Sequence, residues 1–193
     1  MSTLPRYLPP ADVERVIAAC DGSTAIGIRD KAIILLLARL GLRASEVADL
    51  QFDAIDWSRA TFSVTGKSRR EAKLPLPQDV GDALLHYLET ARPTVDDNHV
   101  FITAIAPWAP ITRSVVKSAA AQAMRRAGVE APSFGAHILR HSAATALLRQ
   151  GASLQVIGEV LRHRCVDTTA HYAKIDVDLL QQVARPWPGG APC

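Results

Sequence analysis

Four short stretches of this sequence carry side chains that could bind a phosphate group. They span residues 41–46, 66–70, 137–141 and 161–172. In the first, Arg43 stands just before a predicted helix start, where backbone N–H groups and the helix dipole favour an anion. Taken alone, this stretch is also explained by a surface ion pair between Arg43 and Glu46.

The stretch 66–70 is basic and lies at the second turn of a predicted β-meander. Its cationic residues are Lys67, Arg69 and Arg70. Basic side chains at a hairpin tip can reach into a DNA groove and contact phosphate oxygens. When this stretch is considered alone, a solvated surface loop is the favoured interpretation.

His137 and Arg140 stand three residues apart on a predicted helix and therefore share one face. A histidine and an arginine on one face can hold a phosphate from two sides, although they are also ordinary polar residues of a first helical turn. His141 follows His137 at the i+4 spacing of a metal pair. The sequence suggests no third ligand nearby, so we do not predict a metal site.

Tyr172 lies nine residues after His163, and Arg162 and Arg164 flank that histidine. A single tyrosine is usually a core residue whose hydroxyl is hydrogen-bonded at the edge of the core. For Tyr172, however, a functional role is favoured over a core role, because the candidate residues of the other three stretches precede it in the chain as one ordered set. Each stretch is ordinary by itself, and the combination is not.

Hydrophobic periodicity places these stretches in an α+β fold that is mainly α-helical. Helices are predicted from Pro10 onward and over residues 29–40, 45–50, 78–91, 112–127, 136–150, 153–161, 168–173 and 176–184. Gly41 should end the helix 29–40 as a C-terminal cap, and Ser45 should be the N-cap of the helix that follows.

Between the helices, the pattern changes to strand-like alternation. Strands over 52–57, 61–65 and 71–76 predict a small three-stranded antiparallel sheet, and a further short strand is predicted over 99–102. The apolar face of the sheet should hold Phe62, Val64, Leu74 and Leu76.

Composition restricts the broad class of protein. The chain has 193 residues, enough for a sizeable core, and its net charge of +3 has the sign for a DNA partner without deciding it. Three scattered cysteines predict neither a disulfide framework nor zinc, which favours the cytoplasm. The first residues lack the apolar segment of a signal peptide, and no apolar run is long enough to span a membrane.

Together the motifs resemble the tyrosine recombinase, or phage integrase, family. The segments that carry the resemblance are ARLGLRASEVADL, VTGKSRREAKLPLP, HILRHSAATALLRQGASLQVIGEVLRH and TTAHYAKI. The resemblance extends from about Pro10 to Ala184, which corresponds to the whole catalytic domain of that family. The resemblance implies the integrase-like DNA breaking-rejoining fold and a site-specific recombinase.

The resemblance also implies roles for the candidate residues. Arg43 and Arg140 would clamp the scissile phosphate, Tyr172 would attack it, and Glu46 would support the site. On chemical grounds Lys67 is the general acid for the leaving 5′ oxygen, His137 handles the tyrosine proton, and His163 donates to a non-bridging oxygen. The product would be a 3′-phosphotyrosyl link, formed without metal, ATP or another cofactor. Arg69, Arg70, Arg162 and Arg164 are predicted DNA-binding residues.

Two residues depart from the family pattern. The hairpin often reads Gly-Lys-Gly, and Ser68 follows Lys67 here; the later motif often reads Leu-Gly-His, and Arg162 replaces the glycine. Neither change removes a predicted catalytic group. Arg162 would either alter the approach to DNA or pack at the surface.

The predicted organisation is an arm over residues 1–9, the catalytic domain over 10–185 and a flexible tail over 186–193. Family members usually carry an N-terminal DNA-gripping domain, for which the first residues are too few. The sequence is therefore an isolated catalytic domain, a truncated piece or an unusually short member.

The expected partner is double-stranded DNA, with a homotetramer on paired sites, a monomer in solution, and no membrane association. The predicted helix over 176–184 would dock on a neighbouring subunit. The alternatives are a type IB topoisomerase that relaxes supercoils, a DNA-binding regulator with this fold and no turnover, and a helical scaffold unrelated to DNA.

Overall fold

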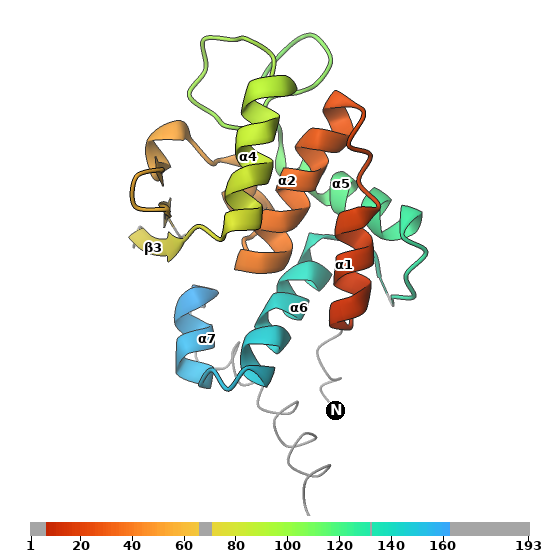
Figure 1. The fold of residues 1–193 in the computed structure, drawn as a ribbon, viewed down its shortest axis with the longest axis vertical. Helices are drawn as coiled ribbons and strands as arrows, with labels where there is room; N and C mark the ends of the chain where they lie inside the picture. The colour runs from red at the N-terminus through yellow and green to blue at the C-terminus, as the bar shows by residue number, and fades with distance from the viewer. Residues whose placement is uncertain (1–6, 66–70, 132, 163–193) are drawn as a thin grey trace, which may run out of the picture.

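The protein is described here from a computed structural model, over residues 7–65, 71–131 and 133–162. Most of this part of the chain is helical, with one small antiparallel sheet (Figure 1). The elements are α1 Pro10–Ala18, α2 Ala25–Leu40, α3 Ala44–Ala48, a 3₁₀ turn Phe52–Ala54, β1 Ile55–Asp56, β2 Thr61–Thr65, β3 Glu71–Pro75, α4 Gln78–Thr90, α5 Arg113–Arg126, α6 Ala136–Arg149 and α7 Leu154–Val160. The predicted fold class is confirmed.

Helix α2 is the centre of the fold and packs against α4, α5 and α6 (Figure 1). Every residue from Ala32 to Ala38 is buried, as expected for a helix covered on all sides. It begins at Ala25, four residues before the predicted start, because the Thr24 hydroxyl accepts a hydrogen bond from the Gly27 N–H and caps the helix. As predicted, it ends at Gly41, which adopts the left-handed conformation with φ 58°.

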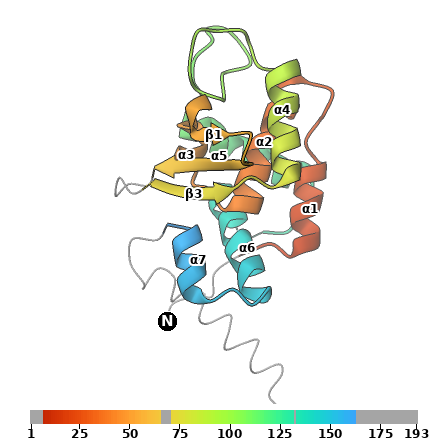
Figure 2. The ribbon, with the colours of Figure 1, turned by 60° about the vertical axis from the view of Figure 1, so that its left-hand side comes forward.

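The three strands form a meander in the order β1-β2-β3, and Figure 2 shows them side by side. Phe62 pairs with Leu74, and both are buried together with Val64 on the apolar face, as predicted. The first strand is shorter than predicted. The Phe52 N–H donates to Asn98 O and the Ala54 N–H donates to Gln51 O, so residues 52–54 turn instead of pairing in the sheet.

Two further local predictions were wrong. The N-cap of α3 is Arg43 and not Ser45, because the Glu46 carboxylate accepts the Arg43 N–H and starts the helix one residue earlier. Residues 99–102 form isolated bridges and not a strand, since His99 pairs with Gln51 and Ile102 with Pro110. Arg92 donates to the carbonyls of Val100, Asp97 and His99, which folds this segment back on itself.

Helices α6 and α7 lie together beside α2, and α7 closes a small apolar cluster of Ala144, Leu148, Ile157 and Leu161. The end of the predicted arm is tied to α6, because the Leu8 N–H donates to Ser142 Oγ at 2.8 Å. In the described part of the chain, no helix is both long and apolar enough to cross a membrane. The helices predicted over 168–173 and 176–184, and the predicted tail, lie outside the described residues.

Candidate functional site

The turn between α2 and α3 sets the position of Arg43. Gly41 reverses the chain, Leu42 is fully buried, and Arg43 follows at the start of α3. Glu46 holds the arginine twice: Oε2 accepts the Arg43 backbone N–H at 2.7 Å, and Oε1 accepts Nη1 at 2.7 Å. The ion pair considered in the sequence analysis therefore exists, and it fixes the arginine at the turn.

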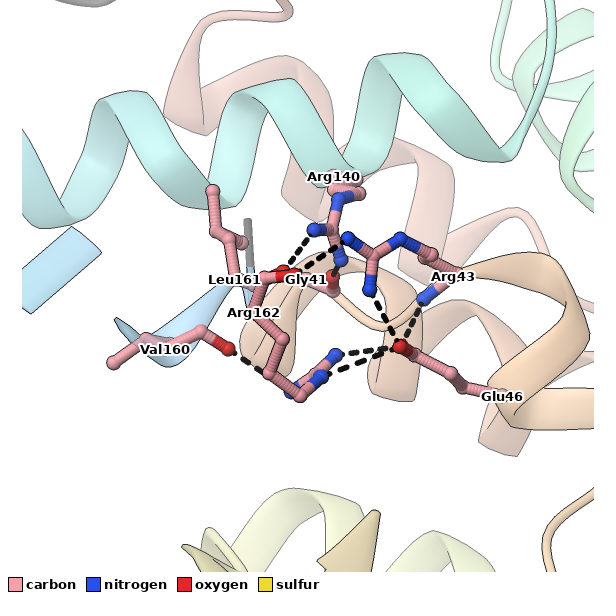
Figure 3. Close-up of polar contacts among 7 residues, drawn as sticks. All are labelled: Gly41, Arg43, Glu46, Arg140, Val160, Leu161 and Arg162. Atoms are coloured by element: carbon pink, nitrogen blue, oxygen red, sulfur yellow. Dashed lines mark hydrogen bonds and ion pairs between the residues drawn. The ribbon is translucent and has the colours of Figure 1, made fainter. Parts of the chain in front are cut away.

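Arg140 reaches the same place from α6. Its Nη1 donates to the Gly41 carbonyl and its Nη2 donates to the Leu161 carbonyl. Arg43 Nη2 donates to the next carbonyl, that of Arg162, at 2.8 Å. Because two adjacent carbonyls accept from the two arginines, the guanidiniums lie side by side between α3, α6 and the end of α7 (Figure 3). Residues separated by about a hundred positions are thus brought together.

Arg162 also belongs to this cluster through its side chain. Its Nη2 lies 2.5 Å from Glu46 Oε2, and its Nε donates to Oε1 at 3.2 Å. The two side chains are only 8% and 6% exposed. Arg162 adopts the left-handed conformation with φ 52°, which ordinarily favours glycine. We call Arg43, Glu46, Arg140 and Arg162 the arginine cluster.

Glu46 is the carboxylate of the arginine cluster, and its pKa is lowered below 4.5. Burial by itself raises the pKa of Glu46, but hydrogen bonds from the Arg162 side chain and the Arg43 backbone outweigh it. The carboxylate therefore remains ionised at neutral pH although it is almost inaccessible to water. Two guanidiniums, those of Arg43 and Arg162, bind this carboxylate, and Arg140 adds a third to the cluster. The cluster therefore has an excess of positive charge, as an anion site requires.

An open pocket of about 400 Å³ lies beside the cluster. Its walls come from the turn after α2, from α5 and from the start of α6, with lining residues Leu42, Arg43, Ala44, Lys117, Phe134, Gly135, Ala136, His137 and Arg140. His137 is exposed there, and its Nε2 lies 3.1 Å from Ser133 Oγ. The structure thus places His137, Arg140 and Arg43 around one cavity.

Lys117 is a residue of this pocket that the sequence analysis missed. It lies on α5, its side chain is exposed, and no hydrogen bond or ion pair joins it to another residue of the described ranges. The only available signal was the spacing of α5, whose apolar residues Val116, Ala120 and Met124 face the core. That spacing places Lys117 outside the buried face of α5, but it does not indicate that Lys117 lines the same pocket as Arg43 and Arg140.

Other predicted residues lie outside the described part of the chain: Lys67, Arg69, Arg70, His163, Arg164 and Tyr172. Their roles stay predictions. Within the described residues, no cluster of three or more histidine, cysteine, aspartate or glutamate side chains could hold a metal ion. The rings of His137 and His141 meet edge to face with their centres 6.4 Å apart.

Comparison with known proteins gives the class of this chain. The model of the phage integrase family matches residues 6–178. The chain therefore belongs to the phage integrase family.

The relatives include recombinases of several bacteria. The chain is 47% identical to the putative integrase/recombinase y4rA of Sinorhizobium fredii over 99% of its length, and 33% identical to the tyrosine recombinase XerD of Xanthomonas campestris over 97%. It spans 47% of the first relative and 61% of the second. Another relative, y4gC of Sinorhizobium fredii, is 36% identical and is covered over 91% of its length.

Solved structures agree on the fold. XerH bound to a palindromic difH substrate, in a post-cleavage complex, aligns with a TM-score of 0.82 at 22% identity, over 97% of this chain and 54% of XerH. XerA recombinase aligns with a TM-score of 0.79 at 24% identity, over 96% of this chain and 66% of XerA. At these identities the similarity concerns the fold.

Proposed function

We propose that this chain is the catalytic domain of a site-specific DNA recombinase that cuts and rejoins strands through Tyr172. The observation that carries the proposal is the convergence of Arg43 and Arg140 beside the pocket that His137 lines. Both arginines donate to the last described carbonyls before His163, so the segment leading to the second histidine begins at the cluster. Relatives named integrase/recombinase and tyrosine recombinase support the same activity.

In this proposal the arginines neutralise the scissile phosphate. Attack on a phosphodiester increases the negative charge on its non-bridging oxygens, and guanidiniums fixed in advance stabilise that charge without reorganising. His163 adds a further hydrogen bond to a non-bridging oxygen. The positive charge of the arginines takes the place that a divalent cation has in other phosphoryl-transfer sites.

The chemical step exchanges one phosphodiester for another. Tyr172 Oη bonds to phosphorus and the bond to the 5′ oxygen breaks. His137 accepts the tyrosine proton, and Lys67 gives a proton to the departing 5′ oxygen. The product is a 3′-phosphotyrosyl bond with a free 5′ hydroxyl, and attack by a 5′ hydroxyl from either strand restores the DNA without ATP.

Basic side chains around the pocket would hold the duplex. We assign this role to Lys117, and to Arg69, Arg70 and Arg164 as predicted from the sequence, because lysines and arginines supply the sequence-independent contacts to phosphate. Arg113, at the exposed start of α5, extends the same surface. We propose double-stranded DNA as the partner and the cytoplasm as the location of the protein.

Exchange between two DNA sites needs several subunits, and we propose a tetramer on paired sites in which residues 176–184 dock on a neighbour. Deleting residues 175–193 should weaken assembly on paired sites more than cleavage of a single site. Equal losses in a gel-shift and a cleavage assay would contradict this arrangement.

The test of the proposed function is a covalent trap. Nicked duplexes covering the DNA that flanks the gene are incubated with the protein and resolved on a denaturing gel. We expect an adduct in wild type, none in Tyr172→Phe, and unchanged yield in EDTA. DNA binding without an adduct would indicate a regulator without turnover. Relaxation of supercoiled plasmid without exchange between paired sites would indicate a topoisomerase.

A further inference from the structure

Arg162 is the residue of the arginine cluster for which the family pattern gives no role, since a glycine often occupies its place in that pattern. Its conformation suits glycine, with φ 52°, yet an arginine occupies it. Left-handed backbone is unfavourable for a residue with a Cβ and persists where neighbouring contacts hold it. Here Arg162 donates from Nη1 to the Val160 carbonyl at 2.9 Å and from Nε and Nη2 to Glu46.

The Arg162 guanidinium faces inward and not toward the DNA side. Its side chain is 8% exposed, against 31% for Arg43. It is absent from the residues that line the pocket, whereas Arg43, Arg140 and Lys117 all line it. A side chain placed in this way cannot add a phosphate contact without first leaving Glu46.

Sharing Glu46 changes what Arg43 can do. A buried carboxylate demands compensation from the cations beside it. With Arg162 present, Glu46 accepts one N–H from the Arg43 side chain, which lines the pocket, and Arg43 Nη2 donates to the Arg162 carbonyl. Without Arg162, Arg43 would be the one guanidinium of the described residues still bonded to Glu46, and a bidentate pair with the carboxylate would turn it away from the pocket.

We propose that Arg162 is a positioning residue: by binding Glu46 it keeps Arg43 turned toward the scissile phosphate, and it does not contact DNA itself. This proposal rests on the proposed function, because it assumes that Arg43 acts on that phosphate. The left-handed backbone contributes as well, since it presents the Arg162 carbonyl to Arg43 next to the Leu161 carbonyl that accepts from Arg140. The segment that leads to His163 is thereby tied to both arginines.

The test compares DNA binding with cleavage in Arg162→Gly. Glycine accepts the backbone conformation, so the variant removes the contacts with Glu46 and leaves the turn. We expect covalent-adduct formation at saturating DNA to fall by about 10- to 100-fold, on the scale of a small misplacement of a reacting group. The dissociation constant for duplex DNA and its salt dependence should match wild type.

Two further variants keep the test decisive. Arg162→Lys keeps the charge but not the planar fork, and should recover part of the lost rate. In Glu46→Gln, adding Arg162→Gly should cause little further loss, because Arg162 acts through Glu46. Lys117→Ala is the control for a DNA contact, since it should reduce affinity and the salt slope.

Two results would overturn the proposal. One is an Arg162→Gly variant that cleaves like wild type at saturating DNA. The other is a loss of affinity with a salt slope reduced by about one, the mark of a lost phosphate contact. Failure of the proposed function is distinguishable from both, because wild type would then form no adduct. If Arg162→Gly does not fold, as judged by its unfolding transition, the Arg162→Lys variant decides between the outcomes.

Discussion

The pocket lined by Arg43, Arg140, His137 and Lys117 has two walls that are built differently. On one side, Arg43 and Arg140 line the pocket and are half-buried, while the side chains of Glu46 and Arg162 in the same cluster are buried. Each guanidinium of this cluster has two or more hydrogen-bond partners from separate elements (Figure 3), and we call this side the buried wall. On the other side, Lys117 and His137 are exposed, and His137 has Ser133 as its hydrogen-bond partner at 3.1 Å. Cations fixed by hydrogen bonds suit charge that develops during the reaction, and an exposed cation such as Lys117 suits attraction of DNA. For the arginines and the lysine that line the pocket, the wall should therefore predict whether the loss affects rate or affinity.

The largest effect should come from Tyr172, the proposed nucleophile, because both walls of the pocket are proposed to act on the DNA that it attacks. Tyr172→Phe should abolish the covalent adduct and leave DNA affinity near wild type, because only the attacking oxygen is lost. A denaturing gel measures the adduct and a gel shift measures binding. An adduct that survives this change would remove Tyr172 from the mechanism.

Next in size is the loss of a cation from the buried wall. Arg140→Ala should slow cleavage by at least about 100-fold, the scale for removing one transition-state donor. Single-turnover cleavage at saturating DNA measures it, and Leu139→Ala on the same helix controls for damage to folding. Cleavage at the wild-type rate would show that this wall does not stabilise the reacting phosphate.

A smaller effect should follow from adding a methyl group at Gly41, where the turn after α2 packs against Leu161. Gly41→Ala places Cβ about 2.6 Å from Leu161 Cδ2 in a left-handed conformation. We expect a loss of about 1–3 kcal/mol in the free energy of unfolding, from backbone strain and overpacking. Urea denaturation measures it, with Gly22→Ala as the control because nothing lies within 4 Å of a Cβ there. Equal stability of both variants would contradict tight packing of Leu161 on this turn.

Acid should also affect the buried wall. The folded-state pKa of Glu46 is lowered, so its contribution to stability is present at neutral pH and is lost as the pH falls through that pKa. Glu46→Gln should therefore remove part of the stability at pH 7 and flatten the dependence of stability on pH in the acid range. Urea midpoints across the acid range measure this, and parallel curves for both proteins would contradict it.

The smallest effect belongs to the exposed wall. Lys117→Ala should lower DNA affinity at low salt and reduce the slope of log affinity against log salt by about one. Binding titrations at several salt concentrations measure it, and Lys31→Ala, on the exposed side of α2, is the matched control. A normal slope would exclude Lys117 from the DNA surface.

The sequence predicted the architecture and the convergence of Arg43 with Arg140, because periodicity and turn residues act locally and the family motif supplies the long-range order. The prediction of Ser45 as the N-cap of α3 was wrong, because the Glu46 carboxylate accepts the Arg43 N–H and the helix starts earlier. The sequence also could not place Arg162 or Lys117. The position of the Arg162 side chain depends on the Glu46 carboxylate, more than a hundred residues away in the chain. The position of Lys117 at the pocket depends on how α5 lies beside the start of α6.

The carbonyls of Gly41, Leu161 and Arg162 that receive the arginines have a consequence for how the family can diverge. Main-chain oxygens are present whatever side chain a residue carries, so point mutation cannot delete these acceptors. These hydrogen bonds therefore depend on the path of the chain at positions 41, 161 and 162, and the acceptors do not depend on the side chains there. An arginine can therefore replace a glycine at position 162 without removing the carbonyl that accepts from Arg43. Its side chain is then available for a further contact, here the one with Glu46.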